Sequence, residues 1–131
     1  MLSYDKIWST FLNNYKTEDW DVPQEDSERY KFIGNAVLLY NNKFRTEAVA
    51  NDELEVVEGL STQDDLLILA MYVKSTFLEN TRIYYERLLQ GYDGDVGFKN
   101  FSAQLVSIRE SVRQNDLLIK EFIFNTRETF L

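Results

Sequence analysis

Eight apolar residues in a row, Leu66 to Val73 (LLILAMYV), most strongly constrain how this chain can fold. A helix that is apolar all round must be covered on every side, and a run this short cannot cross a bilayer. Two hydroxyl side chains, Ser61 and Thr62, can cap such a helix, and the aspartates of its first turn suit the positive end of its dipole. Because these start signals and the polar continuation favour a helix over a buried strand, we expect a central helix over residues 61–80.

The segments before this run predict two helices that each have one apolar face. Ser3 can cap a first helix that runs to about Lys16. Pro23 suits the start of a second helix, which ends near Asn42 or one turn later. Gly34 and Ala36 lie on this second helix and are small, so they allow a neighbouring element to approach closely there.

The last helix is expected from Ser102 to about Thr126. Its apolar positions alternate four and three apart, the spacing of a coiled-coil seam. The positions are Phe101, Leu105, Ile108, Val112, Asn115, Ile119 and Phe122. Asn115 is the single polar member. Either its side chain lies in the seam and fixes the register of the helices, or the apolar stripe shifts to Leu118 at this point. The spacing leaves both alternatives open.

Two segments predict loops. Residues 45–60 are rich in carboxylates and poor in large apolar groups, so we expect a loop with at most one helical turn. Residues 91–97 hold three of the five glycines and predict a second loop, while a break of the central helix at Asn80 stays undecided. The sequence therefore predicts an all-α protein with a single domain over residues 1–131. Four to five helices form a bundle around a buried central helix, with an acidic loop between the second and third helices.

The sequence contains neither cysteine nor histidine. This removes disulfides, thiolate chemistry, the usual zinc sites and the commonest general base. Carboxylate pairs and carboxylate-bound metals are the catalysts left, but the acidic residues lie at helix starts and in loops, where the helix dipole and solubility account for them. Asp93 and Asp95 lack the further ligands of a calcium loop. We therefore expect no enzyme activity, no cofactor and no metal.

The acidic side chains are concentrated in the first half of the chain. The formal net charge is −8; residues 1–65 hold 14 acidic and 6 basic side chains, and residues 66–131 hold eight of each. Because phosphates are bound by Lys and Arg, the first half is not expected to bind nucleic acid or an anionic membrane. The acidic surface either keeps the protein in solution or has a binding role. The start MLSYDKIW has no signal-peptide pattern, so we expect a soluble intracellular protein.

The stretches MLSYDKIWSTFL, LSTQDDLLILAMYVKSTFLEN and FKNFSAQLVSIRESV, in this order, resemble the small helical head-to-tail connector (neck or adaptor) proteins of tailed bacteriophages of Gram-positive hosts. The resemblance spans most of the chain, and it departs from many related sequences at Phe77, where they have Trp. It implies a virion structural protein of the neck, assembled in the host cytoplasm as a homo-oligomeric ring. Its implied partners are the portal protein and the tail or a second connector, and DNA passes through without specific binding. Neither a membrane nor a small-molecule substrate is implied.

The acidic segments, one tryptophan and the chain end form the candidate interface or channel surface. Trp20, between two aspartates, either folds over the core or anchors an interface, because tryptophan is enriched at binding hot spots. The candidate residues are Glu18, Asp19, Trp20, Asp21, Glu25, Asp52, Glu53, Glu55, Phe130 and Leu131. The alternative is a small acidic regulatory protein, which mimics DNA or inhibits a basic host protein.

Overall fold

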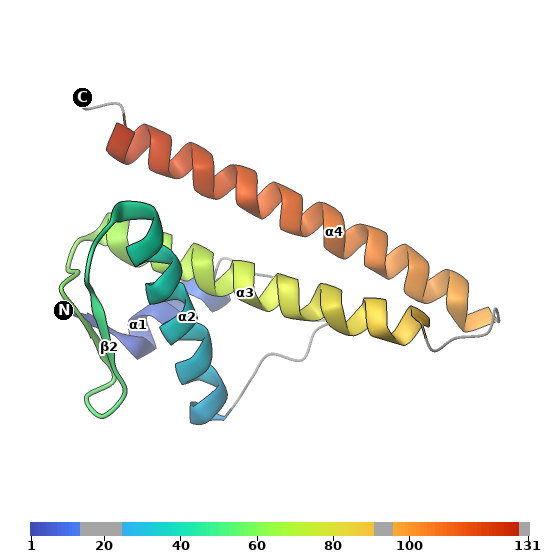
Figure 1. The fold of residues 1–131 in the computed structure, drawn as a ribbon, viewed down its shortest axis with the longest axis horizontal. Coiled ribbons are helices and arrows are strands. Elements are labelled where there is room, and N and C mark those ends of the chain that lie inside the picture. The colour runs from blue at the N-terminus through green and yellow to red at the C-terminus, as the bar shows by residue number, and fades with distance from the viewer. Residues whose placement is uncertain (14–24, 91–95, 129–131) are drawn as a thin grey trace.

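The computed structural model describes residues 1–13, 25–90 and 96–128. Two short segments open the chain, β1 (Leu2–Ser3) and α1 (Tyr4–Asn13), and α2 (Asp26–Phe44) follows. A hairpin of β2 (Val49–Asn51) and β3 (Val56–Glu58) leads into two long helices, α3 (Gln63–Gln90) and α4 (Val96–Ile123). A π-helical turn, η1 (Phe124–Glu128), continues α4 (Figure 1).

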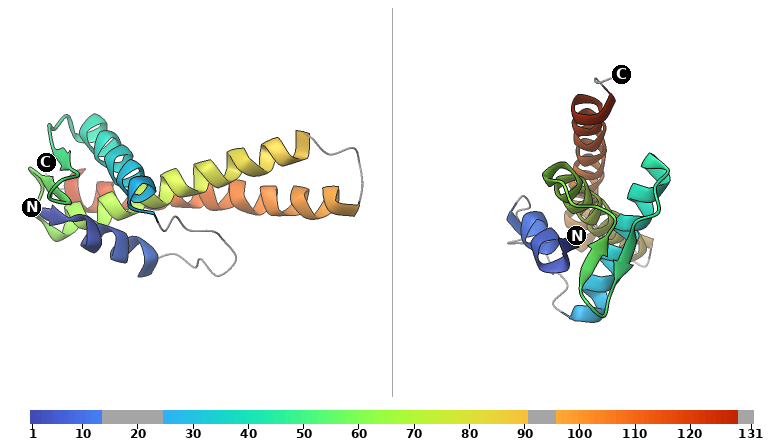
Figure 2. Two further views of the ribbon diagram at one scale, coloured as in Figure 1. Left: turned by 90° about the horizontal axis from the view of Figure 1, so that it is seen from below. Right: turned by 90° about the vertical axis from the view of Figure 1, so that its left-hand side faces the viewer.

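Helix α3 is the central helix that the apolar run predicts. None of its residues 64–79 is exposed, and Ile68, Leu69 and Val73 are completely enclosed. Helices α1, α2 and α4 all pack on it, and Figure 2 shows them arranged around it in the end-on view. The prediction of a central helix covered on every side is therefore confirmed.

The start of α3 is held by a reciprocal cap. Thr62 Oγ1 accepts a hydrogen bond from the Asp65 amide at 3.1 Å, and Asp65 Oδ2 accepts one from the Thr62 amide at 3.4 Å. The other oxygen of the buried Asp65 carboxylate accepts a hydrogen bond from the Tyr40 hydroxyl at 2.5 Å. One aspartate thus caps α3 and joins it to α2.

Helix α3 continues without a break to Gln90, which settles the question left open at Asn80. Its outer part, residues 78–90, runs beyond α1 and α2 beside the start of α4, residues 96–110 (Figure 2). We call this pair of segments the arm and the rest of the molecule the body. Leu78, Leu105 and Ile108 are buried in the arm, apart from the main core. Helix α4 begins at Val96, so the predicted second loop is wrong for Val96 and Gly97.

Asn115 lies in the seam between α3 and α4. Its side chain is only 3% exposed and donates a 3.4 Å hydrogen bond to the Met71 carbonyl, whereas Leu118 is 52% exposed. Leu105, Ile108 and Ile119 are buried on the same stripe. The alternative with Asn115 in the seam is therefore the correct one, and the partner helix of the seam is α3 of the same chain.

Residues 45–60 form a hairpin, not the predicted loop. Strand β3 pairs with β2 and also with β1, both antiparallel, in the order β1-β3-β2 with Val57 opposite Leu2 and Ala50. Val57 of the middle strand is completely buried and belongs to the main core. The all-α prediction is thus correct for most of the described chain but misses three short strands.

The ends of the first two helices differ from the predicted ones in detail. Ser3 Oγ accepts the Lys6 amide at 3.1 Å, as expected of a cap, but α1 ends at Asn13. Helix α2 begins at Asp26 and ends when Arg45 adopts a left-handed conformation with φ 57°. No atom lies within 4 Å of the position that a Cβ would take on Gly34, so the expected close approach is wrong there, whereas Ala36 is completely buried in the core.

Candidate functional site

The acidic turn between β2 and β3 is held in one conformation from both ends. Asn51 Oδ1 accepts hydrogen bonds from the amides of Glu53 and Leu54, each at 3.1 Å. Glu55 closes the turn in a left-handed conformation with φ 54°, and its carbonyl accepts the Tyr4 amide at 2.8 Å. We call residues 51–55 the acidic turn. Sequence patterns for hairpins miss it because a non-glycine residue has the positive φ.

Two tyrosines fasten this turn to the helices. The Tyr4 hydroxyl of α1 donates to Asp52 Oδ1 at 2.6 Å, and the Tyr30 hydroxyl of α2 donates to Glu55 Oε1. The two rings meet edge to face with centroids 5.5 Å apart. The hydrogen bond to Glu55, together with burial, raises the pKa of Tyr30 to about 12. Burial, with the bond to Asp52, raises the pKa of Tyr4 as well.

Carboxylates from three elements gather around these tyrosines. Asp5 of α1, Asp26 of α2 and Glu55 of the turn line one shallow depression with both rings, and Asp52 lies beside it on Tyr4. We call these four carboxylates the acidic face. Arg29 lies among them and pairs with Asp26 at 2.8 Å. Such a face attracts basic partners and repels phosphates.

The predicted interface residues divide into three groups. Asp52 and Glu55 belong to the acidic face, and Glu53 is exposed on the acidic turn. Glu25 is exposed at the N-cap of α2, next to Asp26. Six residues lie outside the described residues, namely Glu18, Asp19, Trp20, Asp21, Phe130 and Leu131.

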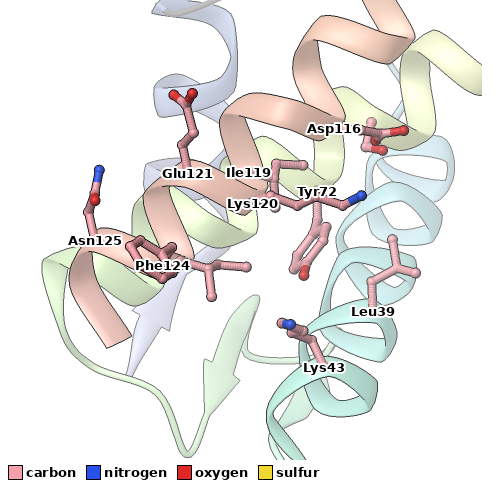
Figure 3. A pocket seen from close by; sticks show the side chains of 11 residues that line it. Leu39, Lys43, Tyr72, Asp116, Ile119, Lys120, Glu121, Phe124 and Asn125 are labelled. Carbon is pink, nitrogen blue, oxygen red and sulfur yellow. The ribbon is translucent and has the colours of Figure 1, made fainter. Parts of the chain in front are cut away.

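A groove lies between α2, α3 and the end of α4, with a volume of about 710 Å³. Its floor is apolar, with Ile119 and Ile123 buried in it. In Figure 3, Leu39 and Lys43 come from α2, and Tyr72 from α3 points between the helices. Burial raises the pKa of the Tyr72 phenol.

Three further charged residues line this groove, all from α4. Lys120 lies near Asp116 at one end, and Glu121 points away from α2 in Figure 3. Burial and the nearby Glu79 raise the pKa of Asp116, while Lys120 opposes them. Sequence analysis missed the groove because its walls come from three segments that are far apart in the chain.

A smaller cavity of about 200 Å³ lies between α1, α3 and α4, and Asn115 and Lys74 are among the residues that line it. Burial lowers the pKa of the Lys74 amine. Within the described ranges, acidic residues do not cluster tightly enough to hold a metal ion, and no helix has the length and apolarity needed to span a membrane.

The fold and the site define a small, mainly helical protein with a projecting two-helix arm, an acidic face and a groove. The model of the YomZ prophage protein family matches residues 1–128, and the chain belongs to this family. It is 43% identical, over 131 residues that make up the whole of both chains, to the SPbeta prophage-derived uncharacterized protein YomZ of Bacillus subtilis (strain 168). No solved structure matches the chain. These findings confirm the bacteriophage origin that the sequence resemblance implied.

Proposed function

We propose that the chain is a virion structural protein that forms a homo-oligomeric ring in the phage neck, between the portal and the tail. The prophage family and the resemblance to head-to-tail connectors support this function. DNA passes through such a ring without being bound specifically. In this role the chain is not an enzyme and acts through its surfaces.

The projecting arm is the observation that carries the proposal. Apolar side chains are exposed on both of its helices, with Ile83 and Tyr84 on α3 and Val106 on α4. Inside the arm, Arg109 of α4 pairs with Glu86 of α3 at 2.9 Å, and Glu86 also binds Arg82 at 2.8 Å. The arm is therefore a braced projection with apolar groups on its surface, as expected of an element that packs against a neighbouring subunit.

The acidic face suits the channel of such a ring. DNA carries one negative charge per phosphate, and carboxylates that face it repel the duplex, so that DNA slides without sticking. Salt screens this repulsion within about 10 Å at moderate ionic strength. We propose that part of the acidic first half faces the channel or a basic partner, either Glu25 with the acidic residues 18–21 or Asp52, Glu53 and Glu55.

The acidic face also favours a second function, that of an acidic regulatory protein that binds a basic host protein. Asp26 of α2 lies with Asp52 and Glu55 of the acidic turn around one pair of tyrosines, which makes a compact negative surface. Such binding would depend strongly on salt, because surface charge pairs are screened. A regulator would be made in the host cell but would be missing from purified virions.

Deletion of the gene from a prophage that encodes this chain tests the two functions against each other. A connector is required to join heads and tails, so induction of the deletion strain should yield DNA-filled heads and separate tails by electron microscopy. Mass spectrometry of wild-type virions should find the chain as a stoichiometric component, and tagged copies should localise to the neck. Tailed, infectious particles from the deletion strain would contradict the connector function.

A further inference from the structure

The acidic turn presents one apolar side chain to solvent. Leu54 is 65% exposed, although the turn around it is fixed by hydrogen bonds at Asn51, Asp52 and Glu55. Leu54 is not part of the core, so these bonds do not serve to bury it. A rigid segment that holds an exposed leucine loses little conformational entropy when that leucine is bound.

The groove has an apolar floor, and Lys43 lies at its α2 side. Buried Ile119 and Ile123 form its apolar floor, and Phe124, which is 56% exposed, forms part of its rim. Lys43 stands on its α2 side, where Figure 3 shows the amine next to the opening. The volume of about 710 Å³ exceeds that of one leucine side chain and has room for the flanking residues of a turn.

The charges of the two surfaces are complementary at the point of contact. Asp52 and Glu53 precede Leu54, and a leucine inserted between α2 and α4 would bring these carboxylates to the rim that carries Lys43. The acidic residues of the groove lie elsewhere, Asp116 near Lys120 at one end and Glu121 turned away from α2 (Figure 3). Opposite charges at a partly desolvated rim favour one orientation of the partner.

The positions of turn and groove require that they belong to different copies. Helix α2 crosses the body in Figure 1 with its C-terminal end beside the groove, and the tip of the hairpin lies at the other end of α2. One chain therefore cannot fill its own groove with its own turn. A contact between two different patches of identical copies is heterologous, and such contacts close into a ring when the rotation allows.

We infer that the acidic turn of one copy inserts Leu54 into the groove between α2, α3 and α4 of the next copy. This inference rests on the proposed ring and names the surfaces that hold it together. If the groove instead holds a different protein or a small amphipathic molecule, Leu54 of a neighbouring copy does not lie in the groove.

Disulfide trapping tests this contact in the full chain, which has no cysteine of its own. Copies with Leu54→Cys are mixed with tagged copies that carry Phe124→Cys, oxidised with diamide, and separated by mass. Contact raises the effective concentration of the two thiols, so the mixed dimer should exceed the control by about tenfold. The control mixes Leu38→Cys copies with the same Phe124→Cys copies. Leu38 is as exposed as Leu54, but it lies on α2 outside the acidic turn and does not line the groove.

A chain with both Leu54→Cys and Phe124→Cys should give a ladder that ends at the closed ring. Trapping detects weak or brief association, so a mixed-dimer yield equal to the control overturns the inference even where wild-type copies stay monomeric. If rings form or tagged copies localise to the neck while the cross-link is absent, the inferred contact is overturned but the proposed function stands. The ring would then be held together by other surfaces. A strong cross-link in a chain that is missing from virions would support the contact and contradict the neck function.

Discussion

Gly34 lies in the middle of α2 with open space around the position of a Cβ. Glycine in a helix interior costs about 1 kcal/mol relative to alanine, mainly through the entropy of the unfolded chain. Gly34→Ala should therefore raise the free energy of unfolding by about 0.5–1 kcal/mol, measured by urea denaturation.

Gly59 is the matched control for this substitution. It has φ +96°, and a Cβ there would lie 3.4 Å from the Ala48 Cα. Gly59→Ala should destabilise the protein by about 1 kcal/mol or more, because alanine is strained at positive φ. Changes of the same sign in both variants would contradict the backbone geometry described for α2 and the end of β3.

Tyr30 makes stability sensitive to alkaline pH. Its pKa of about 12 in the folded protein exceeds the ordinary value of 10.0, so the folded state holds the phenol proton more tightly than the unfolded state. The stabilisation is complete below the unfolded pKa and is lost as the pH rises through the folded pKa. The midpoint of urea unfolding should therefore fall between about pH 10 and about pH 12, with part of the fall due to Tyr30.

Tyr30→Phe removes the titrating group and should reduce this fall, although the variant is less stable at neutral pH because Glu55 loses its donor. Tyr84→Phe is the control, since this exposed tyrosine of the arm does not donate to a carboxylate in the described structure. An equal pH dependence in wild type and in Tyr30→Phe would show that the tyrosine and Glu55 do not interact in solution.

At the scale of elements, the long helices were predictable because their signals are local. The cap at Thr62, the apolar run after it and the seam spacing of α4 all lie within a few turns of the helix they specify. The small sheet was not predictable in this way. Its strands have two or three residues each, and β3 lies between β2 and a strand from the start of the chain. Such strands depend on pairing across the fold, which no short sequence window contains.

The candidate site was predictable in part for the same reason. The acidic composition of residues 45–60 pointed to Asp52, Glu53 and Glu55, but not to their tyrosine partners, which lie 25 and 48 residues away. Leu54 has a local signal, as a lone leucine among three acidic residues, but the sequence does not show that its side chain is exposed. The groove had none, because α2, α3 and α4 form it only after folding.

The seam between α3 and α4 leads to a prediction about Asn115. The amide is buried, its hydrogen bond to the Met71 carbonyl is long at 3.4 Å, and that carbonyl lies inside α3, where it also accepts from the helix backbone. A buried asparagine in such a seam costs stability. Asn115→Leu should raise the free energy of unfolding by about 1 kcal/mol in thermal or urea denaturation.

Leu118→Asn is the control on the same helix. Leu118 is half exposed, so exchanging it for a polar residue should change stability by about 0.5 kcal/mol or less. A loss of stability in Asn115→Leu larger than in the control would mean that the asparagine is needed for the pairing of α3 with α4.

The whole molecule combines a body that carries charge with an arm that carries exposed apolar groups. The acidic face is confined to α1, α2 and the hairpin, which belong to the half of the chain that holds all of the net negative charge. The arm comes from the half whose charges balance, and its Arg82 and Arg109 pair with Glu79 and Glu86 of α3. The net negative charge of the bodies opposes their approach except where a basic group faces the acidic turn, so copies can associate through the apolar arm and through the turn and the groove that Lys43 lines.

Val106 and Val49 allow the role of the arm to be tested with one and the same substitution. Val106 lies on the arm and is 63% exposed, while Val49 lies on β2 in the body and is 55% exposed. Neither Val106→Ser nor Val49→Ser should change the free energy of unfolding by more than about 0.5 kcal/mol, because neither side chain is buried.

If the arm packs against a neighbouring subunit, Val106→Ser should lower the yield of tailed particles by about tenfold or more when it complements the deletion strain, since an apolar contact buried at an interface is lost. Val49→Ser should complement as well as wild type. Equal yields from the two variants would mean that the exposed arm makes no contact that assembly needs, and the ring would then have to be held by the body alone.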